Sequence, residues 1–377
     1  MIFFIKITHT KSMKKVINNK LFLFIPIIII MIISFLNMYN AKLLSSLYIS
    51  NLTKQIIWYL ISFSILIIIR SLNIKFIYKY SFLFYLLTTF LLLYVLIFGK
   101  VTNGAKAWIN FGFFSFQPSE IAKLSLTISL SKLTSNYQKS SIKKELVYIL
   151  KILILTLIPS ILVFLEPDTG AIIFFILIAF TVLVLSPIHK FWYLCLLGLG
   201  ISGIALFIIL YIFNQDLLIN LIGTSFFYRV ERIITFKTMS SYQLENALIA
   251  MGSASLFGSG LSKVSLYIPE APTDFIFAFT ISNFGLLTGF LVLICYFFID
   301  LYLINKFLNT PKSITYYILA CFIVISLFSQ LINISMNLGL LPIIGIPLPL
   351  LSYGGSSLII YFMFLGLTQK KPYNNMV

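Results

Sequence analysis

Long runs of apolar residues are the feature that most limits how this chain can fold. One run, residues 20–38, carries charge only at its first residue, and similar runs recur along the whole chain. A helix needs about 20 apolar residues to cross a bilayer, whereas strands of a membrane barrel span about ten residues of alternating polarity. The runs therefore predict an all-α polytopic membrane protein.

The composition agrees with a membrane location and excludes the usual water-soluble classes. Hydrophobic residues make up 60% of the chain and charged residues 10%, against about 25% charged residues in a typical soluble domain. The net charge of +17 would suggest nucleic acid in a soluble protein. No nucleic-acid motif accompanies it, so no such partner is expected, and the isolated cysteines and histidines predict no metal site.

Runs bounded by charge, proline and glycine predict about ten transmembrane helices within a single membrane domain, residues 1–377. The predicted spans are residues 20–38, 52–70, 76–98, 119–133, 146–165, 169–187, 190–213, 273–303, 313–335 and 353–369. Residues 1–19 precede them as a cytoplasmic segment, with Met13 as an alternative start. Residues 214–272 form a large extracytoplasmic loop between the seventh and eighth spans. A structureless loop of this length is uncommon, so we expect it to fold back onto the membrane; a plain solvated loop is the alternative.

The charged residues sort by side when ten spans place both termini together. Eighteen of the 27 basic residues then fall on the side of the termini, which the positive-inside rule assigns to the cytoplasm. Eight of the ten acidic residues fall on the outer side: Glu120, Glu166, Asp168, Asp216, Glu231, Glu245, Glu270 and Asp274. Acidic residues contribute little to orientation, so this gathering predicts a functional site on the outer face.

Two outer segments carry ionisable residues next to predicted helices. In GAKAWINFGFFSFQPSE, residues 104–120, Pro118 opens a helix that holds Glu120 and then Lys123. These two can form a local ion pair, but ionisable residues in a span normally face the bundle interior or a cavity, and we favour a cavity. In EPDTG, residues 166–170, Asp168 either serves the site or simply caps the following helix.

Two further segments complete the outer face. In IPEAPTDFIFAF, residues 268–279, Asp274 directly precedes an apolar helix. It either caps that helix, or desolvation raises its pKa toward the value that a general base needs at neutral pH. Residues 333–357, NISMNLGLLPIIGIPLPLLSYGGSS, are uncharged and too rich in proline and glycine for a helix. Non-helical backbone at membrane depth is tolerated where it is buried or lines a cavity.

The large loop also contains a candidate interfacial helix. Its segment FFYRVERIITF mixes apolar and charged residues, and Arg229 and Arg232 are three residues apart on one helical face. Arginine can hold a phosphate with two parallel hydrogen bonds, and lysine can act as a point charge. Arg229 is the first candidate among the cations of the outer face.

Together these segments resemble the SEDS family of peptidoglycan glycosyltransferases, the RodA, FtsW and SpoVE group. The most specific parts are FQPSE with Lys123, EPDTG, PEAPTDFIFA and MNLGLLPIIGIPLPLLSYGGSS, which occur in the family's order and on the expected side. The MNLGLLP stretch is more similar to the RodA branch than to FtsW. The resemblance implies a multi-pass protein of the bacterial cytoplasmic membrane, acting in cell-wall elongation and rod shape.

The resemblance implies polymerisation of lipid II, an undecaprenyl-diphosphate disaccharide-pentapeptide, into glycan strands at the outer face. Asp274 matches the family's essential aspartate, and we expect it to act as the base or to orient the acceptor. The cations that could hold the diphosphate are Arg229, Arg232, Lys106 and Lys123. Trp108 matches a functionally sensitive tryptophan and would pack on sugar or lipid, or act only as an interfacial anchor. Glu120 and Asp168 are expected in the cavity wall.

The implied partners are a class B penicillin-binding protein and membrane lipids. The resemblance implies no particular cofactor, and a divalent cation is left open. The chain departs from the family's usual residues at Ala107, Ser282, Asn283 and Ile344. These departures leave open a degenerate scaffold that activates a partner synthase. A transporter or flippase for the lipid-linked precursor is a separate alternative from another functional class.

Overall fold

Most residues of the computed structural model are helical, and the structure describes residues 20–102, 105–110, 112, 114–224, 227, 231, 242–263 and 266–370. The first half contains α3 (Leu21–Ala41), the short η1 (Ser46–Tyr48), α4 (Asn51–Ser71), α5 (Ile74–Lys79), α6 (Ser81–Phe98), α7 (Pro118–Ser135) and α8 (Ile142–Leu165). The second half contains α9 (Thr169–Leu185), α10 (Lys190–Phe213), α11 (Gln215–Ile222), α13 (Tyr242–Gly252), α14 (Ile276–Leu308), α15 (Ile314–Asn337) and α16 (Gly355–Thr368).

The prediction of an all-α polytopic membrane protein is confirmed, and each predicted span overlaps a helix. In the described residues, seven helices are long and apolar enough to cross a membrane: α3, α4 with η1, α6, α8, α10, α14 and α15. The helices α9 and α16 are apolar but shorter, and α7 is rich in serine, threonine and charge. The count of ten spans stays a prediction.

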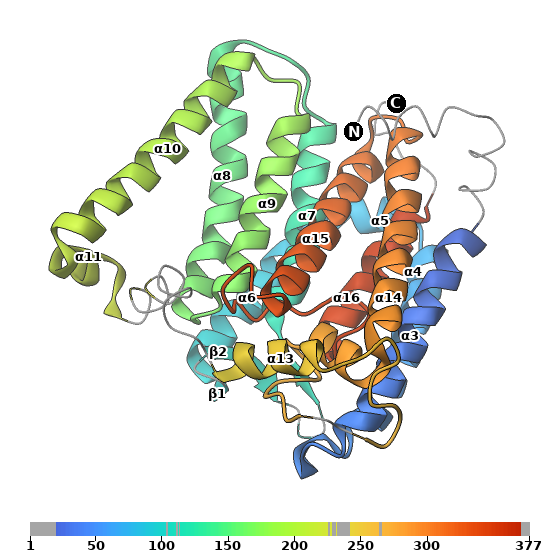
Figure 1. Cartoon of the computed structure of the whole chain (residues 1–377). Coiled ribbons are helices and arrows are strands. Elements are labelled where there is room, and N and C mark those ends of the chain that lie inside the picture. The colour runs from blue at the N-terminus through green and yellow to red at the C-terminus, as the bar shows by residue number, and fades with distance from the viewer. Residues whose placement is uncertain are drawn as a thin grey trace.

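The middle of the bundle is formed by α7, α15 and α16, while α10 lies at its edge (Figure 1). Nearly every residue of α7 is buried, including its polar ones, because α6, α8, α9, α15 and α16 all pack against it. No residue of α10 is buried, and this helix leans away from its neighbours. A helix that is apolar all round and exposed in the bundle suits contact with lipid.

A small sheet, which the sequence reasoning did not predict, joins α6 to α7. The strands β1 (Lys100–Thr102), β2 (Ala105–Asn110) and β3 (Ser115–Phe116) are antiparallel, with Lys100 opposite Trp108. The sequence between β1 and β2 is Asn103-Gly104, a preferred two-residue hairpin turn. That dipeptide is the signal from which the hairpin could have been predicted.

The large loop contacts the bundle through α13 and the segment that follows it. The helix α13 packs on α14 and α15 at the same end as the small sheet, and its Ala247 and Ala250 are fully buried (Figure 1). The predicted interfacial helix lies almost entirely outside the described residues.

Residues 255–260 of the loop are hydrogen-bonded into a break in α14. The helix is interrupted at Gly285, whose φ is +82°. On one side of the break, the carbonyls of residues 282 and 283 accept hydrogen bonds from the amides of Ser259 and Gly260 at 3.1 and 2.7 Å. On the other side, the amides of Leu286 and Leu287 donate to loop carbonyls, each at 3.3 Å. A side chain at Gly285 would collide with the loop backbone, so glycine is needed here for both its conformation and its size.

Candidate functional site

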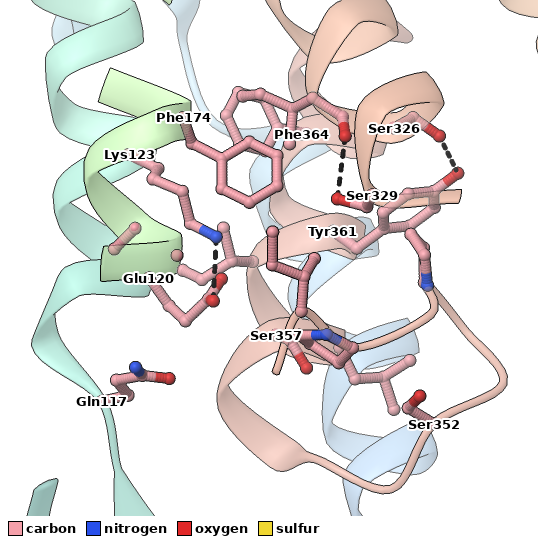
Figure 2. Close-up of a pocket in the computed structure, with 18 of the residues that line it drawn as sticks. Gln117, Glu120, Lys123, Phe174, Ser326, Ser329, Ser352, Ser357, Tyr361 and Phe364 are labelled. Carbon is pink, nitrogen blue, oxygen red and sulfur yellow. Dashed lines mark hydrogen bonds and ion pairs between the residues drawn. The ribbon is translucent and has the colours of Figure 1, made fainter. Parts of the chain in front are cut away.

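A cavity of about 80 Å³ lies between α7, α9, α15, α16 and the irregular segment before α16. Figure 2 shows Glu120 and Lys123 on one wall, with Ser326, Ser329 and Tyr361 across from them. Gly345, Pro347, Pro349 and Ser352 also line it. The structure thus brings the FQPSE, EPDTG and LSYGGSS segments to one cavity. The proline- and glycine-rich segment that contains LSYGGSS was expected to be buried or to line a cavity, and it lines this one.

The α7 wall carries a buried ion pair. Lys123 Nζ lies 2.8 Å from Glu120 Oε1, and the two side chains are only 9% and 11% exposed. The ammonium also lies 4.5 Å from the centre of the Phe174 ring, an additional cation–π contact. Both readings of this pair therefore hold, because Glu120 and Lys123 form a local pair that faces a cavity.

The EPDTG turn places two carboxyl groups differently. Asp168 caps α9 by accepting from the Ala171 amide at 3.3 Å, and it also lines the cavity. Its Oδ2 accepts from Gln117 and Ser119 of the facing segment at 2.7 and 2.9 Å. Asp168 therefore connects the start of α9 to the start of α7. Both of its carboxylate oxygens accept hydrogen bonds within the cavity wall.

Glu166, two residues earlier, is fully buried, and neither of its carboxyl oxygens has a hydrogen-bond partner among the described residues. Burial, with a smaller contribution from Asp168, raises the pKa of Glu166 to about 8. This carboxyl is therefore mainly neutral at pH 7. Its backbone carbonyl accepts from the Lys106 amide at 3.1 Å and so fixes β2 to the end of α8.

Asp274 lies beside the cavity rather than among its lining residues. A Cβ atom at Gly345, which does line the cavity, would be 3.4 Å from Asp274 Oδ2. Burial, followed by the nearby Glu270, raises the pKa of Asp274 to about 7. Among the described residues its carboxyl group has no ion pair and no hydrogen bond. Asp274 is thus a half-buried carboxyl that is free to accept a proton near neutral pH.

Two buried asparagines of α15, which the sequence reasoning missed, fix the backbone around Asp274. Asn337 donates from Nδ2 to the Asp274 carbonyl at 3.0 Å and accepts from the Ala278 amide at 2.9 Å. Its amide group thereby takes the place of the helical bond between residues 278 and 274. Asn333 donates to the same carbonyl at 2.9 Å and to the Ile346 carbonyl at 2.8 Å. A polar pair four residues apart at the end of an apolar helix was the available signal.

The other predicted site residues are not brought to the cavity by the described structure. Lys106 Nζ donates to the Ile97 carbonyl at 2.8 Å, toward the end of α6. Trp108 lies half-buried on β2 and is not a lining residue. Arg229 and Arg232 lie outside the described residues, so their role stays a prediction.

The positions that depart from the family pattern are all packed in the protein. Ala107 is 1% exposed, and Ser282 and Asn283 lie buried at the break in α14. Both polar side-chain atoms of Asn283 lack a hydrogen-bond partner in the described part of the chain. Among all the residues that the structure describes, no three His, Cys, Asp or Glu side chains gather as metal ligands would. No residues are therefore assigned to a divalent cation.

Comparison with known proteins gives consistent matches over most of the chain. Residues 15–373 match the model of the FtsW/RodA/SpoVE family, described as a cell cycle protein. A probable peptidoglycan glycosyltransferase FtsW of Wigglesworthia glossinidia brevipalpis is 33% identical over 85% of this chain and 83% of its own length. A protein of the same name from Buchnera aphidicola subsp. Schizaphis graminum is 34% identical over 82% of this chain and 87% of its own.

Solved structures share the fold at lower identity. A chain from a peptidoglycan synthase complex matches with a TM-score of 0.73 and 24% identity, covering 91% of this chain and 95% of its own. The rod shape determining protein RodA of Thermus thermophilus matches with a TM-score of 0.64 and 24% identity, covering 92% and 94%. At this identity the structural matches establish the fold alone.

Proposed function

Because the chain belongs to the FtsW/RodA/SpoVE family, we propose that it is a peptidoglycan glycosyltransferase that polymerises lipid II on the outer face of the bacterial cytoplasmic membrane. The curated relatives described above are named as probable peptidoglycan glycosyltransferases. The chain is a multi-pass membrane protein, which places it in the same bilayer as a lipid-linked substrate. Lipid II as the substrate and cytoplasmic termini are parts of this proposal.

The observation that carries the proposal is the environment of Asp274. Its carboxyl group has a pKa of about 7, lies next to the cavity through Gly345, and is held by its backbone rather than by its side chain. A general base works best when its pKa is near the operating pH. A carboxyl already held in a salt bridge would lack this property.

In the proposed reaction, the hydroxyl oxygen of the acceptor sugar attacks the anomeric carbon of the donor. The bond from that carbon to the lipid diphosphate breaks, the configuration inverts, and the hydroxyl proton passes to Asp274. Lipid diphosphate leaves with the bonding electrons and needs positive charge nearby. Among the described residues that line the cavity, Lys123 is the one basic side chain, and it already pairs with Glu120. Arg229 and Arg232 are proposed to supply further charge.

The test is Asp274→Asn in purified protein reconstituted with lipid II, with glycan strands separated on a gel. We expect polymerisation to fall below detection while the amount of folded protein in the membrane is unchanged. Asp216→Asn is a matched control, because Asp216 is exposed in the first turn of α11. Full activity of the Asp274 variant would remove that residue from the mechanism. Activity of the unmodified protein alone would exclude the inactive scaffold.

The proposal includes a class B penicillin-binding protein as partner, supported by the structural match to a chain of a peptidoglycan synthase complex. Co-purification of the two proteins tests it. The role in elongation stays a prediction, since the curated relatives described above carry the FtsW name. Rescue of rod shape rather than of septation in a depleted host would support elongation.

A lipid-linked precursor transporter is the second candidate, and one structural observation favours it. Gln330 donates to Asp300 at 3.2 Å and to Ser326 at 3.0 Å, and Ser326 lines the cavity. This polar chain extends from the cavity into α14, where an ionisable residue is costly unless it has a function. Movement of lipid II across sealed vesicles without polymerisation would favour transport.

A further inference from the structure

We propose that Lys20, Arg70, Lys306 and Lys370 form a binding site for the phosphate of an anionic phospholipid, at the end of the bundle opposite the small sheet. This end is the one that the positive-inside rule assigns to the cytoplasm. The proposal concerns a surface that takes no part in the glycosyltransferase site.

The four cations converge from four different helices. The start of α3, which Lys20 precedes, lies beside the last part of α14, where the Phe22 and Phe298 rings are 5.0 Å apart, and Lys306 follows eight residues later in α14. Its Nζ donates to Gln369 Oε1 at 3.3 Å, which places it next to Lys370. Lys370 Nζ in turn donates to the Arg70 carbonyl at 3.4 Å. The close packing of α3 on α14 and of α4 on α16 explains this convergence.

No acidic side chain among the described residues pairs with these cations. The described structure contains two ion pairs, Lys123 with Glu120 and His189 with Glu145, and neither includes a member of the cluster. All ten acidic residues fall within the described part of the chain, and residues 1–19 and 371–377 contain none. Those two terminal segments instead add five lysines. The acidic side chains therefore supply no ion pair to this cluster in the described part of the chain.

Helix dipoles account for only part of the arrangement. Arg70, Lys306 and Lys370 lie at helix C-termini, where a cation interacts favourably with the partial negative charge. Lys20 lies at the N-terminus of α3, where the same dipole is unfavourable to a cation. Lys306 is also half-buried, and a charged group removed from water needs a partner. An anion at the centre of the four side chains would offset the unfavourable position of Lys20 and give the half-buried Lys306 a charged partner.

The surrounding surface favours a lipid over a free anion. Leu21, Ile68 and Leu308 lie within two residues of Lys20, Arg70 and Lys306 in sequence and are 60%, 54% and 55% exposed. Their helices are apolar enough to cross a membrane. A phosphate attached to acyl chains would contact the cations and this apolar surface together, as basic pockets between helices do on the cytoplasmic side of membranes.

The experiment measures phosphatidylglycerol bound to the full-length protein in detergent, by native mass spectrometry, with phosphatidylcholine and inorganic phosphate as competing probes. We expect one tightly held phosphatidylglycerol that neither competitor displaces. The triple variant Lys20→Gln, Arg70→Gln, Lys306→Gln should bind it roughly a hundredfold more weakly, at about fivefold per cation.

The matched control removes three exposed cations from the same predicted side, at the ends of α8 and α10: Lys143→Gln, Lys144→Gln, Lys190→Gln. It should retain the tightly held lipid. Equal weakening in the two triple variants would show nonspecific attraction and overturn the proposal. Displacement by inorganic phosphate would also overturn it, because the site would then hold a free anion. If the triple variant does not fold, Lys306→Gln alone decides, with about fivefold weakening expected.

Discussion

Replacing Asn337 with leucine should slow catalysis although the side chain never reaches the cavity. The Asn337 amide connects the Asp274 carbonyl and the Ala278 amide, at 3.0 and 2.9 Å, at the first turn of α14. Leucine has a similar size and keeps the packing of this fully buried position. It removes both hydrogen bonds, together with those from Asn337 Nδ2 to Asn333 at 2.9 and 3.2 Å, and leaves the Ala278 amide without a partner, while Asn333 still donates to the Asp274 carbonyl.

The stranded amide should cost about 1–3 kcal/mol of stability. The first turn of α14 can recover that energy by rewinding so that residue 278 bonds to residue 274, which moves Asp274. A displacement of about 1 Å at a catalytic group can lower the rate by about a hundredfold. We therefore expect a loss of activity much larger than the loss of folded protein.

The assay compares lipid II polymerisation by Asn337→Leu across pH with that of the unmodified protein, at equal amounts of folded protein. Water reaching the displaced carboxyl would lower the Asp274 pKa from about 7 toward its ordinary 3.8. The remaining activity should then extend to lower pH. Asn309→Leu, at the opposite end of α14, serves as the control and should change neither rate nor profile. Unchanged rate and pH profile in Asn337→Leu would refute the reasoning.

Three further outcomes are expected. The rate of the unmodified protein should rise with pH through about 7, because Asp274 accepts a proton only when ionised; a flat profile between pH 5.5 and 8.5, on the order of 1.5 units either side of that pKa, would contradict this. Lys123→Met should lower the free energy of unfolding by about 3–5 kcal/mol, since it leaves Glu120 buried without its partner. Adding Glu120→Gln should restore part of this loss, and thermal melting of the two variants measures the difference. Gly285→Ala should reduce the yield of folded protein in size-exclusion chromatography, because its Cβ would collide with the loop backbone.

The helices could be predicted from sequence because bilayer thickness and apolarity nearly determine them. The predicted span 190–213 coincides with α10, and the span 119–133 lies within α7 despite its polar residues. Glu120, Lys123 and Asp168 line one cavity. The sequence pointed to this because the predicted topology places their segments at the same, outer side of the membrane. The small sheet escaped prediction because its strands are two to six residues long, although the Asn103-Gly104 turn was visible.

The role of Asn337 could not be predicted, because it depends on the contact between α14 and α15 and not on local sequence. The position of Lys106 was equally inaccessible. Its ammonium donates to the Ile97 carbonyl, a contact that depends on how β2 packs against the end of α6. Long flexible side chains are placed by their surroundings, whereas glycine and proline positions such as Gly345 are fixed by backbone conformation.

The four backbone hydrogen bonds between residues 255–260 and the broken part of α14 have a mechanical consequence. The loop is bonded to both sides of the break, and it cannot lift away without freeing four amide–carbonyl pairs. Asp274 precedes the part of α14 that lies before the break, eleven residues before Gly285. Because two of the four bonds lie on each side of Gly285, the loop acts as a clamp that fixes the angle between the two parts of α14, and with it the position of the turn that carries Asp274.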